Sequence, residues 1–206
     1  MKFALPKIYP ITDTTLSGLS HADQVRHLID GGATVIQLRD KSASSAEFYK
    51  AASEVVALAR DSEARIIIND RVDIALAAGA DGVHLGQDDL PPEHARKILG
   101  PDAIIGFSTH SVEQAQAAVA LPIDYIAIGP VFSTSTKIGA EPTVGLDGLR
   151  SVRREIGAFP LVAIGGINRE NLMSVLEAGA NSAAMISGIV SDPSQITARI
   201  RELLST

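Results

Sequence analysis

The chain has 206 residues, a net charge of -6, and 46% hydrophobic against 20% charged residues. This length and balance predict one globular domain, residues 1–206, with a sizeable core. An acidic chain with only 4% aromatic residues is not expected to bind nucleic acid, since such binders are usually basic and often stack bases on aromatic rings. No apolar run reaches the roughly 18 residues of a membrane span, and cysteine is absent, so we expect a cytoplasmic protein with no membrane partner and no thiolate chemistry.

Eight short apolar runs recur along the chain, each followed by a helix-like segment. They are rich in β-branched residues and continuously apolar, which is typical of parallel strands buried on both faces. Eight such units in series predict an α/β fold, a single (β/α)8 TIM barrel, and their even spacing argues against an open doubly wound sheet. In chain order the runs are Ile8–Thr12, Thr34–Arg39, Arg65–Asn69, Gly82–Leu85, Ile104–Phe107, Tyr125–Ile128, Leu161–Ile164 and Ser182–Ile186.

The segments between the runs carry signals for helix ends. Ser44 with Glu47, and Ser111 with Gln114, fit capping boxes. Gly79 precedes a strand and is expected to supply the left-handed residue that ends a helix. The long irregular segment 129–145, rich in Ser, Thr and Gly, is of a length that is usually functional or mobile, and we consider it a candidate lid.

Polar residues at the carboxyl ends of barrel strands face the active site of this fold. After the second run, Gln37, Arg39 and Lys41 alternate and can project to one side. A single cation there would be an ordinary solvated strand end. Two cations and an amide on one side favour a binding site for an anion.

Two carboxylates, Asp70 and Asp89, follow the third and fourth runs. Either alone would be an ordinary helix N-cap. Together they place carboxylates on neighbouring loops, and Mg2+ typically takes one or two protein carboxylates plus waters and substrate phosphates. The spacing leaves the helix caps and the magnesium diphosphate site as alternatives.

The last two strand ends carry glycines, at Gly165, Gly166 and Gly188. Loops at these places often bind phosphate in this fold, because glycine lets backbone N–H groups approach an anion. A simple tight turn is the alternative. Ser108 is either a ligand donor or an N-cap.

The histidines give weaker signals. His84 lies within a strand and is expected to be a satisfied interior residue, whereas His21, on a predicted helix, is expected mostly to face solvent. No Ser-His-Asp pattern or zinc-ligand spacing is present.

Seven short stretches complete the pattern: Tyr9-Pro10-Ile11-Thr12-Asp13, Gln37-Leu38-Arg39-Asp40-Lys41, Asn69-Asp70, His84-Leu85-Gly86-Gln87-Asp88-Asp89, Gly129-Pro130-Val131-Phe132 with Thr134-Ser135-Thr136-Lys137, Gly165-Gly166-Ile167 and Met185-Ile186-Ser187. In this order, from end to end of the chain, they resemble the thiamine phosphate synthase family. The resemblance implies a Mg2+-dependent transferase of thiamine biosynthesis, joining a hydroxymethylpyrimidine diphosphate to a thiazole phosphate (or its carboxylated precursor) with release of diphosphate.

The resemblance also implies roles for residues. The pyrimidine diphosphate would be held by Gln37, Arg39, Lys41, Asn69 and Lys137, with Ser108 beside the pyrimidine. The thiazole phosphate would be held by Thr134, Thr136, Gly166, Ile186 and Ser187. Leu38, Asp40 and Ser135 would also belong to the residues that bind these small phosphorylated substrates. Arg39, Lys41, Ser108 and Lys137 would be catalytic, and Asp70 and Asp89 would ligate Mg2+. Stabilising the leaving anion and positioning the thiazole nitrogen would suffice, with no strong general base.

Two rival functions remain beside this one. The related thiazole tautomerase resembles the synthase but has a histidine where this chain has Pro130, and it lacks the paired aspartates seen here as Asp70 and Asp89. A non-catalytic barrel that binds phosphorylated ligands would not need the full set of cations and carboxylates. A homo-oligomer is compatible with the sequence.

Overall fold

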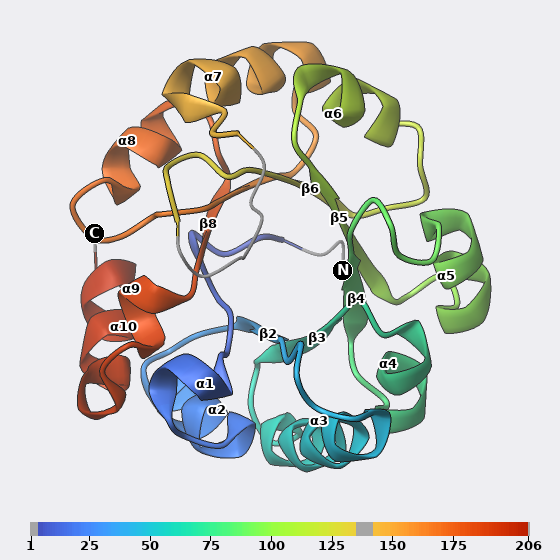
Figure 1. The fold of residues 1–206 in the computed structure, drawn as a ribbon, viewed down its shortest axis with the longest axis vertical. Coiled ribbons are helices and arrows are strands. Elements are labelled where there is room, and N and C mark those ends of the chain that lie inside the picture. Colours follow the sequence, from blue (N-terminus) through green and yellow to red (C-terminus); the bar gives the residue numbers. More distant parts are fainter. Residues whose placement is uncertain (1–3, 135–141, 206) are drawn as a thin grey trace.

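The computed structural model describes residues 4–134 and 142–205, and these residues form a parallel barrel (Figure 1). The hydrogen-bonded strand order is β1-β8-β7-β6-β5-β4-β3-β2, and every pairing is parallel. A parallel bridge between Ile11 and Gln37 joins the two ends of that order, and the Thr12 amide donates to the Gln37 carbonyl at 2.9 Å. The predicted barrel is therefore confirmed. Its strands are β1 Ile8–Pro10, β2 Val35–Leu38, β3 Arg65–Asn69, β4 Gly82–Leu85, β5 Ile104–Thr109, β6 Tyr125–Ile128, β7 Leu161–Ile164 and β8 Ser182–Met185.

Helices cover the outside of the strands (Figure 1). They are α1 Thr14–Ser17, α2 His21–Asp30, α3 Ser45–Ala59, α4 Val72–Ala78, α5 Pro92–Leu99, α6 Val112–Ala118, α7 Gly145–Ile156, α8 Leu172–Glu177, α9 Ser187–Val190 and α10 Ile196–Leu204, with a 3-10 turn at Pro193–Gln195. Gly31, at the end of α2, lies so close to Ile200 of α10 that a Cβ would overlap it. The last helix therefore packs against the first long one, and glycine is required at the contact. In the described part of the chain no helix is long and apolar enough to cross a membrane.

Two apolar layers form because side chains alternate along each strand. In β3, Ile66 and Ile68 belong to the cluster between strands and helices, whereas Ile67 lies in the cluster inside the barrel. The inner cluster also contains Tyr9 and Tyr125, both fully buried. The apolar runs in the sequence thus reflect burial on both faces of one sheet.

The helix-end signals in the sequence form as predicted at Ser44 and Gly79, and only in part at Ser111. The Ser44–Glu47 capping box forms in both directions, with the Ser44 amide 2.9 Å from the Glu47 carboxylate. Gly79 ends α4 in the left-handed conformation, with φ of 69°. Ser111 caps α6, but the Gln114 side chain accepts from the amide of His110 rather than that of Ser111, so only half of the predicted box is made.

Candidate active site

A cavity of about 500 Å³ opens at the carboxyl ends of the strands. Eleven of the residues predicted to bind substrate or metal line it: Gln37, Arg39, Lys41, Asn69, Asp70, Asp89, Ser108, Thr134, Gly166, Ile186 and Ser187. The side chains of Leu38 and Asp40 are not among the lining residues; Leu38 packs between the barrel and its helices, and Asp40 is described below. The predicted Ser135, Thr136 and Lys137 lie outside the described residues.

One side of the cavity combines cations with carboxylates. Lys41 forms an ion pair with Asp70, and the guanidinium of Arg39 lies 3.7 Å from the Asp13 carboxylate. Arg39 is largely buried, whereas the Lys41 side chain is 60% exposed, so Lys41 is free to reorient toward a ligand. The alternating positions of the sequence do place both cations at the same rim.

Asp70 and Asp89 lie next to each other, as the two loops predicted. One carboxylate oxygen of Asp89 accepts from the Gly86 amide at 2.7 Å, and Asp70 adopts an unusual positive φ of 63°. Partial burial raises the pKa of Asp89; the neighbouring Asp70 raises it further, and the Gly86 amide and Lys41 oppose this. Two close carboxylates with an incompletely compensated charge form a donor set that suits Mg2+. The described residues contain no group of three His, Cys, Asp or Glu that could hold a metal, so waters and substrate oxygens would have to complete such a site.

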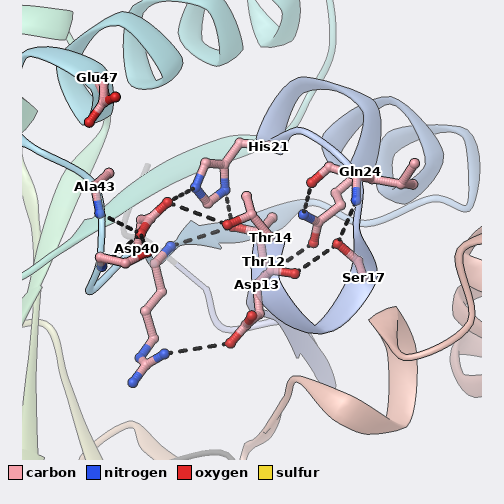
Figure 2. A network of polar contacts seen from close by, with 12 residues as sticks. Thr12, Asp13, Thr14, Ser17, His21, Gln24, Asp40, Ala43 and Glu47 are labelled. Atoms are coloured by element: carbon pink, nitrogen blue, oxygen red, sulfur yellow. Dashed lines mark hydrogen bonds and ion pairs between the residues drawn. The ribbon is translucent and has the colours of Figure 1, made fainter.

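A polar network beneath the loop after β2 holds that loop in place (Figure 2). One oxygen of Asp40 accepts from the amides of Ser42 and Ala43, each at 2.9 Å. Burial alone would raise the pKa of Asp40, but these hydrogen bonds and His21 outweigh it, and the pKa is lowered. Asp40 therefore acts on the cation-bearing loop from the side away from the cavity.

His21 belongs to this network, and the expectation that it mostly faces solvent was wrong. Its imidazole lies 2.7 Å from the Thr12 hydroxyl and 3.4 Å from the Asp40 carboxylate (Figure 2). It is only 4% exposed, because α2 packs its first turn onto the ends of β1 and β2. Burial lowers the pKa of His21, and Asp40 partly opposes that shift. The sequence contains no local sign of this contact, since its partners Thr12 and Asp40 come from the segments that follow β1 and β2.

Inside the barrel, under the cavity, the predicted satisfied histidine is confirmed. His84 bonds the hydroxyl of Tyr125 at 3.0 Å through Nδ1 and that of Ser108 at 2.8 Å through Nε2. Burial lowers the pKa of His84 to about 4, with Asp70 opposing the shift. Burial also raises the pKa of Tyr9 to about 12 and that of Tyr125 well above its ordinary value. These groups are therefore neutral near pH 7.

No role was predicted for Tyr9 and Tyr125 from the sequence. Both line the cavity, and their hydroxyls lie 2.9 Å apart. The available signal was a tyrosine within an otherwise aliphatic run, since a buried hydroxyl requires a hydrogen-bond partner.

The opposite side of the cavity is formed by glycine loops. Gly165 and Gly166 have φ of 103° and 63°. A Cβ on Gly165 would overlap Pro130, and one on Gly166 would overlap Phe132 and the Ser133 carbonyl. Glycine is thus required both by the backbone conformation and by the close approach of the loop after β6. This packing brings the loops after β6, β7 and β8 together around Thr134, Gly166 and Ser187.

The fold and these loops define a TIM-barrel protein with a rim site suited to phosphorylated small molecules. A family model described as thiamine monophosphate synthase matches residues 8–189, and the chain belongs to this family. It is 45% identical to a protein of Koribacter versatilis named thiamine-phosphate synthase, over 97% of this chain and 96% of that protein. A protein of Syntrophomonas wolfei with the same name is 48% identical over 89% of this chain and 88% of its own length.

Solved structures agree with this family and with the barrel fold. Thiamine phosphate pyrophosphorylase from Pyrococcus furiosus is 39% identical, with a TM-score of 0.84 over 97% of this chain and 95% of its own. A tryptophan synthase α-subunit from the same organism has a TM-score of 0.72 at 16% identity, over 99% of this chain and 100% of that one, which reflects the barrel fold alone.

Proposed function

We propose that this chain is a transferase that forms thiamine phosphate. It would move a pyrimidinylmethyl group from 4-amino-2-methyl-5-(diphosphooxymethyl)pyrimidine to a thiazole phosphate or its carboxylated form. The methylene C–O bond breaks and its electron pair leaves with diphosphate; the lone pair of the thiazole nitrogen forms the new C–N bond. With the carboxylated thiazole, the carboxyl group must also leave as CO2. The observation that carries the proposal is one cavity with cations and paired carboxylates on one side and glycine loops on the other. The relatives named thiamine-phosphate synthase support it over a tautomerase or a non-catalytic barrel.

The cationic side accounts for activation of the pyrimidine substrate. As diphosphate departs, negative charge builds on its oxygens, and Arg39 and Lys41 lie at the rim to stabilise it. A cation about 4 Å from a phosphate oxygen contributes roughly 4 kcal/mol gross at an effective dielectric constant of about 20. Lys137 is assigned to the same task by the resemblance alone.

Asp70 and Asp89 would hold Mg2+ beside these cations. Their proximity fits, since partial burial and then the neighbouring Asp70 raise the pKa of Asp89, and a bound cation would compensate the charge that both disfavour. When bound, Mg2+ would neutralise charge on the diphosphate as it leaves. Lys41, now paired with Asp70, would turn to the diphosphate instead.

The glycine side would position the second substrate. Backbone N–H groups of the loops after β7 and β8 would bind the thiazole monophosphate, with the hydroxyls of Thr134 and Ser187 beside them. A neutral site is sufficient for the thiazole nitrogen, because that atom attacks with an available lone pair. No described residue is required as a strong base.

The direct test is product formation. Purified protein with Mg2+ and both substrates is expected to yield thiamine phosphate and diphosphate in equal amounts, measured by chromatography and a diphosphate assay. Folded protein that gives no product above a control without enzyme would refute the proposal.

The two-sided arrangement has its own test. Replacing Asp70 and Asp89 together by Ala is expected to abolish Mg2+-dependent turnover while thiazole phosphate still binds in calorimetry. Asp61→Ala, on the exposed turn after α3, is the matched control. Equal loss of thiazole phosphate binding in the double variant would show that the two sides are not separate.

A further inference from the structure

Five polar side chains form a continuous hydrogen-bond chain across the barrel under the cavity. The Gln37 amide nitrogen donates to the Tyr9 hydroxyl at 3.1 Å, and Tyr9 bonds Tyr125 at 2.9 Å. Tyr125 bonds Nδ1 of His84 at 3.0 Å, and Nε2 of His84 bonds Ser108 at 2.8 Å. The two ends of the chain, Gln37 and Ser108, are residues proposed to contact the pyrimidine substrate.

With Gln37 as the donor to Tyr9, one arrangement of protons satisfies every hydrogen bond of this chain. Tyr9 accepts from Gln37, and Tyr125 is its other hydrogen-bond partner among the described residues, so the single Tyr9 proton goes to Tyr125. In this arrangement the Tyr125 proton goes to Nδ1 of His84. A neutral imidazole that accepts at Nδ1 carries its proton on Nε2 and donates it to Ser108.

Burial keeps the chain intact. Tyr9 and Tyr125 are no more than 1% exposed and His84 is 8% exposed, so water competes little for their protons. The rings of His84 and Tyr125 stack at 5.5 Å. A Cβ on Gly106 would overlap both of them, so a glycine in β5 makes the contact possible.

The direction of the chain gives its ends opposite hydrogen-bonding character. Since Ser108 accepts from His84, its own proton is free to point into the cavity, making it a donor there. Since Gln37 uses its amide nitrogen on Tyr9, its amide oxygen is left as the acceptor, and no described residue donates to that oxygen.

We propose that the Gln37–Tyr9–Tyr125–His84–Ser108 chain presets the cavity as an acceptor at Gln37 and a donor at Ser108, and thereby selects a 4-aminopyrimidine over a 4-oxopyrimidine. This inference rests on the proposed function. An aminopyrimidine offers an amino donor next to a ring-nitrogen acceptor, whereas the oxo form offers a carbonyl acceptor next to a ring N–H donor. Accepting the oxo form would require every proton in the chain to reverse. Tyr9, Tyr125 and His84 are positioning residues in this scheme.

The tautomer of His84 tests the direction without any substrate. Long-range proton–nitrogen NMR correlations on 15N-histidine protein distinguish Nε2–H from Nδ1–H, and the His84→Gln variant assigns the signal. We expect the Nε2–H form in the free protein and a growing Nδ1–H population in Tyr125→Phe. An Nδ1–H form in the unaltered protein overturns the proposal.

Discrimination between ligands tests the consequence. Calorimetry would compare binding of the 4-amino and 4-oxo pyrimidine diphosphates in the presence of Mg2+ and without the thiazole. We expect Tyr125→Phe to lower the preference for the amino ligand by about tenfold, because Nδ1 of His84 loses its donor and the ligand that mispairs with the chain is no longer disfavoured as strongly. Tyr49→Phe, on an exposed position of α3, should leave it unchanged. If Tyr125→Phe binds both ligands more weakly but keeps the same preference for the amino form, the hydrogen-bond chain has only a structural role.

Failure of this inference is distinguishable from failure of the proposed function. If the unaltered protein binds neither pyrimidine diphosphate, both are refuted. If it binds both equally well, or prefers the oxo form, while still forming thiamine phosphate, only the proposed selection is refuted.

Discussion

Replacing Asp89 by Asn distinguishes two possible roles of this side chain, a ligand of Mg2+ and a cap that holds its loop through the Gly86 amide. In Asp89→Asn the side-chain oxygen can still accept from the Gly86 amide, now 2.7 Å from the carboxylate, and the new amide can donate to Asp70. The substitution removes the charge that partial burial and Asp70 disfavour. Without metal, the variant should therefore be more stable than the unaltered protein.

The size of each change in Tm follows from the exposure of Asp89 and from the mass-action effect of bound Mg2+. Asp89 is only partly buried, so screening reduces the gain in unfolding free energy to about 1 kcal/mol, or roughly 2–4 °C in Tm for a chain of this size. A ligand at about 100 times its Kd stabilises by about 2.7 kcal/mol. Mg2+ should thus raise the Tm of the unaltered protein by more than Asp89→Asn does, and should scarcely affect the variant.

The assay is thermal unfolding followed by circular dichroism, with and without Mg2+, and with Asp61→Asn as control. The expected result is a crossover: the variant is the more stable protein without Mg2+ and the less stable one with it. If Asp89→Asn lowers the Tm equally in both conditions, Asp89 serves only to cap the loop through Gly86, and the magnesium site is refuted.

Three further outcomes are expected. Burial lowers the pKa of His84 from its ordinary value of 6.5 to about 4, so between these two pH values the unfolded state takes up a proton before the folded state does. The free energy of unfolding should therefore fall by up to about 3 kcal/mol as the pH drops through this range. Urea titrations of His84→Gln should show a flatter pH dependence. Gly106→Ala should lower the free energy of unfolding by about 1–3 kcal/mol, because the new Cβ overlaps His84 and Tyr125. The control Gly79→Ala should lower it by about 1 kcal/mol, since that Cβ meets open space and only the left-handed backbone is strained. Equal losses of the two variants in urea unfolding would contradict the overlap. Gly166→Ala should raise KM for the thiazole phosphate at least tenfold and leave KM for the pyrimidine diphosphate nearly unchanged; a matching rise in both would argue against a separate monophosphate side.

The eight strands and most of the rim could be predicted from the sequence alone. Strand burial appears as local apolar runs, and in a parallel barrel every strand delivers its following residues to the same end. Neighbours along the chain, such as Gln37, Arg39 and Lys41, were therefore predicted to share a site, and they do line one cavity. Local signals also predicted the capping box at Ser44 and the left-handed end at Gly79.

The pairing of the buried polar side chains emerged only in the folded barrel. Tyr9 and Tyr125 are 116 positions apart when they bond, and His21 is buried between residues of two strand ends. Such contacts depend on barrel closure, which brings β1 and β6 toward one axis and packs α2 onto the rim. Periodicity reports whether a side chain faces inward but not which partner it meets there. The loops that surround the cavity were thus encoded locally in the sequence, whereas the hydrogen-bond chain at its base required the closed barrel.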